Sequence, residues 1–140
     1  VVAEMMKASP AQEVVDWLNS QNPEALYLTT ITLAEVSYGL QILPPGRRRL
    51  QLEQSFERVV PAAFSGRILV FDEKAARSYG ELMGARKVLG RPLSSLDGQI
   101  AAITRAHGGA VATRNVKDFV ECGLAVINPF ERTEGFRPPI

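Results

Sequence analysis

The sequence predicts an α/β domain with a three-layer α/β/α arrangement around a mainly parallel sheet. Short runs of β-branched and apolar residues alternate with longer segments whose apolar residues recur at helical spacing. Glycines and prolines separate these segments at regular intervals, which is typical of short loops in one compact unit. A chain of 140 residues is long enough for one domain with its own core.

The first half of the chain predicts two helices joined by a strand, then a long helix and a second strand. Ser9 and Pro10 provide a helix start, because proline suits the first helical position. The run LYLTTI is rich in the residue types that favour strands. In chain order, the predicted elements are a helix from Ser9 to before Pro23, a strand at 26–31, helices at 32–43 and 47–64, and a strand at 68–71.

The second half continues the alternation of helices with short apolar runs. Gly108 and Gly109 end one of its helices, since glycine is favoured just beyond a helix C-terminus. The predicted elements are helices at 73–89 and 94–107, a strand at 110–113, a helical turn at 115–121 and a strand at 124–127. We expect residues 1–130 to form a single domain and residues 131–140, which are polar and contain proline, to be a loose tail.

The composition excludes several classes of protein. The net charge of +1 gives no overall field that would attract nucleic acid, so such a contact would need a local basic patch. Cys122 is the only cysteine, which favours a reducing, cytoplasmic compartment and excludes an intrachain disulfide. No apolar run approaches the roughly 18 residues of a membrane span, so no membrane contact is predicted. The sequence also lacks a Walker A loop and a G-x-G-x-x-G motif.

An acidic residue lies three positions after a capping residue at three helix starts. The pairs are Thr32 with Glu35, Ser94 with Asp97, and Asn115 with Asp118. Each pair alone is explained by helix capping and by the positive end of the helix dipole. Together they suggest a ligand site, because Glu35 and Asp118 follow strands. In parallel sheets, ligands bind beyond the carboxyl ends of the strands. If the helix of Asp97 starts at that edge, three carboxylates meet there and favour Mg²⁺ or Mn²⁺. Phosphodiester hydrolysis is the chemistry that uses such clusters.

Four segments resemble, in the correct order, the motifs of PIN-domain ribonuclease toxins of the VapC/FitB type. The segment LYLTTITLAEVSYG at 26–39 resembles their second motif and LDGQIAAI at 96–103 their third. ATRNVKDF at 112–119 resembles the fourth motif, and VINP at 126–129 resembles the last strand. Because the resemblance covers nearly the whole chain, it is far more specific than any one motif.

The resemblance implies a cytoplasmic endoribonuclease toxin that depends on Mg²⁺ or Mn²⁺ and forms a homodimer. It also implies a small antitoxin partner whose tail enters the active site, and contact with DNA only indirectly through that antitoxin. Glu35 and Asp97 match metal-site acids of the family, and Asp118 matches its less constant fourth acid. The remaining candidates, which lie in or beside the fourth motif, are polar neighbours and substrate contacts: Thr113, Arg114, Asn115 and Lys117.

The beginning of the chain departs from the family pattern. Family members open with a central apolar strand that ends in Asp-Thr-Asn, and its Asp is a principal metal ligand. The segment Val1 to Lys7 resembles the stretch that follows that motif. We therefore expect the first strand and its Asp to be missing from this chain, with weak metal binding, low activity and a sheet exposed at its middle.

Two alternatives to an active ribonuclease follow from these observations. The first is a catalytically impaired PIN remnant that still dimerises and binds an antitoxin, which the missing first acid favours. The second is a phospho-receiver-like α/β domain, which also clusters carboxylates at a sheet edge. The absent first-strand Asp and the lack of a matching Lys after a strand argue against the receiver. Tyr38 shares a helix side with Glu35, and we expect it to lie in the core or in a dimer interface.

Overall fold

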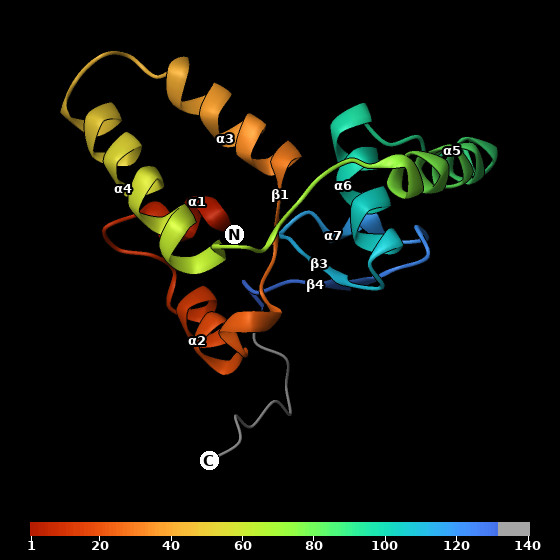
Figure 1. Cartoon of the computed structure of the whole chain (residues 1–140), viewed down its shortest axis with the longest axis horizontal. Helices are drawn as coiled ribbons and strands as arrows, with labels where there is room; N and C mark the ends of the chain where they lie inside the picture. The colour runs from red at the N-terminus through yellow and green to blue at the C-terminus, as the bar shows by residue number, and fades with distance from the viewer. Residues whose placement is uncertain (132–140) are drawn as a thin grey trace.

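A computed structural model gives the structure of residues 1–131, in which helices alternate with short strands (Figure 1). The helices are α1 (Val2–Met6), α2 (Gln12–Ser20), α3 (Thr30–Gln41), α4 (Arg47–Phe64), α5 (Glu73–Val88), α6 (Ser95–Ala106) and α7 (Val116–Phe119), with a 3-10 turn η1 (Pro23–Ala25). The strands are β1 (Leu28–Thr29), β2 (Ile68–Leu69), β3 (Ala110–Ala112) and β4 (Ala125–Ile127). The predicted loose tail at 131–140 lies, apart from Glu131, outside the described residues.

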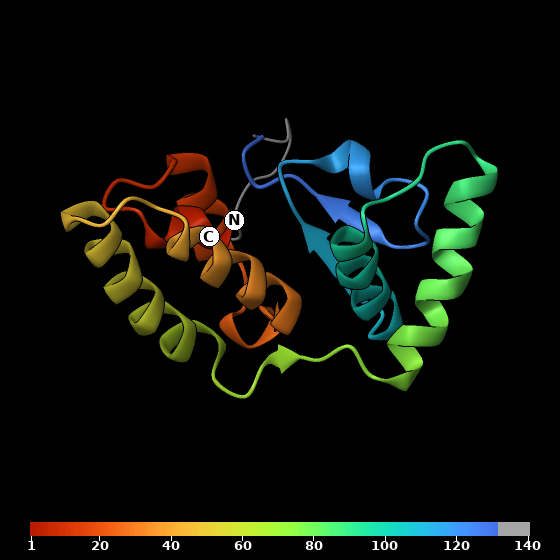
Figure 2. The same ribbon diagram turned by 90° about the horizontal axis from the view of Figure 1, so that it is seen from above.

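The strands form two separate parallel pairs, which confirms the predicted α/β class with parallel strands. β1 pairs with β2, with Leu28 opposite Ile68, and β3 pairs with β4, with Val111 opposite Val126. Within residues 1–131 no strand pairing joins the two sheets. The four strands therefore do not form one continuous sheet in the described residues. Figure 2 shows α1 to α4 on one side of this division and α5 to α7 with β3 and β4 on the other.

The main core lies in the second half of the chain, where α6 packs between α5 and the β3–β4 pair. Its buried members are Leu82, Leu93, Ala101, Val111, Phe119 and Cys122. Arg86 of α5 is also buried, and it donates a hydrogen bond of 2.6 Å to the backbone carbonyl of Val120. These contacts fix α6, and with it the position of the acid near its N-terminus.

The first half has a smaller core that holds α3 and α4 against the N-terminal helices. Val14, Leu28, Leu40 and Phe64 are buried. The Ser55 hydroxyl of α4 donates to the Met6 carbonyl of α1 at 2.9 Å, so these distant segments are tied together. In the part of the chain that the structure describes, no helix is both long and apolar enough to cross a membrane.

Several predicted boundaries differ from the structure by a few residues, and the one between β1 and α3 bears on the site. The strand expected at 26–31 ends at Thr29, and α3 begins at Thr30 rather than at Thr32. The Thr29 hydroxyl accepts a hydrogen bond from the Thr32 amide at 3.0 Å, so Thr29 is the N-cap. A threonine that caps a helix competes with strand continuation, which explains why the strand is so short. By contrast, the helix predicted at 47–64 has those bounds in the structure.

Candidate active site

Glu35 lies in the second turn of α3, directly after β1. Because Thr29 is the N-cap, the first turn of α3 holds no acidic residue, and the predicted capping pair of Thr32 with Glu35 does not form. Glu35 is exposed, and within residues 1–131 its carboxylate takes part in no ion pair. Neither helix capping nor the helix dipole therefore gives the Glu35 carboxylate a structural role.

Asp97 lies in the first turn of α6, where the predicted cap is confirmed. The Ser94 hydroxyl accepts a hydrogen bond from the Asp97 amide at 3.2 Å. No hydrogen bond from the Ser94 amide to the Asp97 carboxylate is present among the described residues, so only half of a capping box forms. The position suits a negative charge because it faces the positive end of the helix dipole. The half-buried carboxylate of Asp97 thus remains free for a ligand.

Gly98 brings the start of α6 close to α5, a role that the sequence analysis missed. A Cβ atom at this position would lie 2.6 Å from Sδ of Met83 and 3.0 Å from Cε2 of Tyr79, both on α5. The available signal was a glycine inside a helical pattern, which is unfavourable unless close packing requires it. Gly98 is therefore a positioning residue for its neighbour Asp97.

Glu35 and Asp97 form a pair of like charges across the contact between α3 and α6. Partial burial of the carboxyl group, and then the nearby Asp97 carboxylate, raise the pKa of Glu35 above its usual range. Neither acid has a salt-bridge partner within residues 1–131. Two carboxylates that repel each other and keep water-accessible oxygens fit a hard divalent cation, which often binds one or two carboxylates and several waters.

Asp118 does not complete a three-carboxylate cluster. Among residues 1–131, no group of three or more His, Cys, Asp or Glu side chains is arranged to hold a metal ion. The Asn115 side chain also fails to cap α7, although the Asn115 carbonyl accepts a hydrogen bond from the Asp118 amide at 3.1 Å. The physical reason is that Glu35 and Asp118 follow strands of two different sheets, so the two strand ends do not share one edge. The structure therefore brings together two of the three predicted acids.

The remaining predicted residues follow β3. The Thr113 amide donates to the Ile127 carbonyl at 2.8 Å, and the Thr113 hydroxyl accepts from the Asn115 amide at 3.0 Å, so Thr113 shapes this turn. The Arg114 guanidinium lies 3.8 Å from the centre of the Phe130 ring, a cation–π contact. Arg114 and Lys117 are both exposed and present positive charge beyond β3. Their role as substrate contacts stays a prediction.

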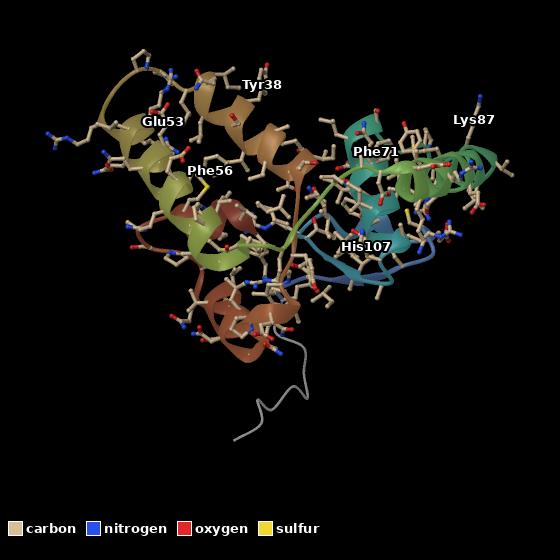
Figure 3. All side chains as sticks on the ribbon, in the orientation of Figure 1. Tyr38, Glu53, Phe56, Phe71, Lys87 and His107 are labelled. Atoms are coloured by element: carbon tan, nitrogen blue, oxygen red, sulfur yellow. The ribbon has the colours of Figure 1, made fainter. Side chains whose placement is uncertain are left out.

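Tyr38 lies one helical turn beyond Glu35, and its side chain is 68% exposed. Of the two predicted locations, the core is therefore wrong, and the dimer interface stays a prediction. Figure 3 shows Tyr38 on the outer side of α3, away from α4. Sequence periodicity gave no signal for this, because an aromatic residue at helical spacing is far more often buried.

Comparison with known proteins places the whole pattern in one family. The model of the PIN domain matches residues 1–121. The chain is 44% identical over 131 residues to the VapC ribonuclease Y4jK of Sinorhizobium fredii, covering 94% of each chain. It is 36% identical over 130 residues to the toxin FitB of Neisseria gonorrhoeae, covering 93% of this chain and 94% of FitB. A solved structure of FitAB bound to an IR36 DNA fragment has a TM-score of 0.86 and 34% identity, covering 96% of this chain and 94% of the other. The chain therefore belongs to the PIN-domain family, and within it to the VapC/FitB type.

Proposed function

We propose that this chain is the ribonuclease toxin of a toxin–antitoxin pair and that it hydrolyses phosphodiester bonds of RNA. The observation that carries the proposal is the Glu35–Asp97 pair, in which two neighbouring acids lack a cationic partner within residues 1–131. The relatives support the same activity, since one is a VapC ribonuclease and another is a toxin.

In the proposed site, Glu35 and Asp97 hold a divalent cation, Mg²⁺ or Mn²⁺. Such an ion would orient a water molecule and stabilise negative charge on the phosphate. We propose that Asp118, in α7, contributes through water, with Thr113 and Asn115 as polar neighbours. Arg114 and Lys117 would contact flanking phosphates, which position a nucleic acid without reading its sequence.

The assembly and compartment belong to the same proposal. We propose that the chain acts in the cytoplasm as a homodimer, that a cognate antitoxin neutralises it, and that any contact with DNA occurs through that antitoxin. The similarity to a FitAB assembly that was solved on a DNA fragment supports the antitoxin partner and its link to DNA.

The test is a cleavage assay on structured RNA with Mg²⁺, with Mn²⁺ and with EDTA. We expect Asp97→Asn and Glu35→Gln to lower metal-dependent cleavage by about 100-fold or more, because loss of outer-shell partners alone often costs about 10- to 100-fold. Asp16→Asn is the matched control, since Asp16 is an exposed acid of α2 that is bound only to Gln12 within the described residues. Equal cleavage by the wild-type chain and Asp97→Asn would exclude catalysis at this site.

A second candidate function is a catalytically impaired module that dimerises and binds an antitoxin. The observation that favours it is the lack of a three-acid group among residues 1–131. Co-purification with the product of a small open reading frame next to the gene, together with RNA cleavage that EDTA and Asp97→Asn leave unchanged from background, would support the module over the enzyme.

A further inference from the structure

We propose that Tyr38 is a stacking surface for an unpaired nucleobase of the RNA, next to the acid pair of Glu35 and Asp97. The inference rests on the proposed ribonuclease function and adds a specificity-determining residue to it. In this arrangement the cation proposed at the two acids would bind the phosphate, and the tyrosine ring receives the base of a neighbouring nucleotide.

The register of α3 supports this placement. Residues three positions apart on a helix lie on the same side, with Cβ atoms about 5–6 Å apart. Glu35 and Tyr38 are related in this way, and both are exposed. In a nucleotide, one sugar separates the phosphate from the base, and this separation is comparable to that between the Glu35 and Tyr38 side chains. A phosphate bound through a cation at Glu35 therefore leaves a neighbouring base within reach of the Tyr38 ring.

The ring itself is available for stacking. Its side chain is 68% exposed, and within residues 1–131 it takes part in no aromatic pair. On α6, Leu96 is 46% exposed and directly precedes Asp97. Each of the two helices that carry an acid therefore also carries an exposed side chain with apolar surface near that acid in the sequence.

RNA accounts for this combination better than a protein surface does. A second copy of the chain would have to bury the two carboxylates, which repel each other, without a cation, and the buried centres of protein interfaces are depleted of charged residues. The antitoxin expected at this site would compete with RNA for it. RNA brings a phosphate and its counter-ions to the acids and a flat ring to the tyrosine. In a duplex the bases are already stacked and paired, so the base at Tyr38 must come from a single-stranded segment.

The test measures the affinity of Tyr38→Ala, Tyr38→Phe and Tyr38→Trp for a short unstructured RNA and for its duplex form, by fluorescence anisotropy. Binding is measured with Ca²⁺ in place of Mg²⁺, so that a cation can hold the phosphate at the acids, and gel analysis of each sample checks that the RNA is uncleaved. We expect Tyr38→Ala to bind the single strand about 5- to 100-fold more weakly, the range for loss of one stacked base. Tyr38→Phe should bind like the wild type, Tyr38→Trp at least as tightly, and duplex affinity should not change.

Two controls separate stacking from other roles. Tyr27 is also an exposed tyrosine, at 56%, but it precedes β1 and lines the cavity between the two sheets, so Tyr27→Ala should bind RNA normally. Ile42 is 64% exposed one turn beyond Tyr38 and further from the acids, so Ile42→Ala should also leave RNA affinity unchanged.

Three outcomes would overturn the inference. One is unchanged single-strand affinity in Tyr38→Ala, and another is no RNA binding by the wild-type chain. The third is loss of a dimer in both Tyr38→Ala and Ile42→Ala at unchanged RNA affinity, which would assign this face to a second copy. If Asp97→Asn abolishes cleavage while Tyr38→Ala changes neither affinity nor KM, the ribonuclease function stands and only the stacking role fails.

Discussion

Glu4 and Glu35 are two carboxylates of this chain whose surroundings shift their pKa values in opposite directions. Glu4 is buried, and it accepts hydrogen bonds from the Lys7 ammonium and from the Ala11 amide at 3.0 Å. The bond from Lys7, and then the bond from the Ala11 amide, lower the pKa of Glu4. Glu35 has no such donors among residues 1–131 and instead faces Asp97. Glu4 is therefore a structural acid that links α1 to α2, whereas Glu35 is free for a ligand.

The residue scale gives a prediction for pH. Because folding lowers the pKa of Glu4, its carboxylate stabilises the fold above the unfolded pKa of about 4.3, and this contribution is lost as pH falls through the lower folded value. We expect Glu4→Gln to lower the free energy of unfolding by about 1 kcal/mol at neutral pH. The difference from wild type should shrink in acid, as measured by urea unfolding at pH values above and below the unfolded pKa.

The control for Glu4→Gln is a second Glu→Gln substitution at an exposed acid. Glu24 is an exposed acid of the η1 turn, so Glu24→Gln should match the wild type at both pH values. If the stability gap for Glu4→Gln stayed constant into acid, the carboxylate charge of Glu4 would not be the source of the stabilisation.

At the scale of elements, a helix boundary could be predicted where only one residue in the local sequence could start the helix. The bounds of α4 could be predicted, because Pro44, Pro45 and Gly46 precede a single amphipathic pattern. The start of α3 could not, since Thr29, Thr30 and Thr32 are all acceptable caps and only tertiary packing selects Thr29. This choice moved Glu35 from the first helical turn to the second. The close approach of α6 to α5 at Gly98 is likewise a contact between elements, which no local pattern contains.

The α5–α6 contact gives the second prediction. Gly98→Ala would place a Cβ atom 2.6 Å from Sδ of Met83 and 3.0 Å from Cε2 of Tyr79, so either these side chains or α6 must shift beside Asp97. Gly84→Ala is matched, because Gly84 lies in α5 and an added Cβ atom there would meet nothing within 4 Å. We expect Gly84→Ala to raise stability by about 0.5–1 kcal/mol through helix propensity. Gly98→Ala should lose this gain and a further ~1 kcal/mol to overpacking, and should lower RNA cleavage.

Thermal unfolding and cleavage rates of the two variants check this prediction. Equal stability of Gly84→Ala and Gly98→Ala would mean that the flexible Met83 side chain moves aside at no cost, and Gly98 would then have no positioning role.

At the scale of the whole molecule, the arrangement of the two sheets decides which acids meet. Alternating strands and helices were enough to predict parallel pairing, because parallel strands need crossover helices. They could not predict that β1 and β3 would remain unpaired with each other, since strand order is a long-range property. The expectation that Asp118 would join Glu35 assumed one shared sheet edge, and the divided sheet removes that assumption. Asp97 lies near Glu35 without a shared sheet edge, because α6 contacts α3 directly.

The divided sheet gives the last prediction, which concerns backbone amides. The Leu28 amide donates to the Arg67 carbonyl at 3.0 Å, and the Thr113 amide donates to the Ile127 carbonyl at 2.8 Å. Successive amides in a strand point to opposite sides, so those of Thr29 and Ala112 point away from the paired strands. Both residues line the cavity of about 390 Å³ between the sheets.

Hydrogen exchange measured by NMR separates these two sets of amides. We expect the amides of Leu28 and Thr113 to be well protected, because they open only when their sheet opens, and those of Thr29 and Ala112 to exchange much faster. Equal protection of all four would contradict open edges and would mean that a further strand, from this chain or from another molecule, covers both sides of the cavity. Because Thr29 also caps α3, such a strand would order the helix that carries Glu35. Protection at Thr29 should then rise together with RNA cleavage, which links the division of the sheet to the activity of the site.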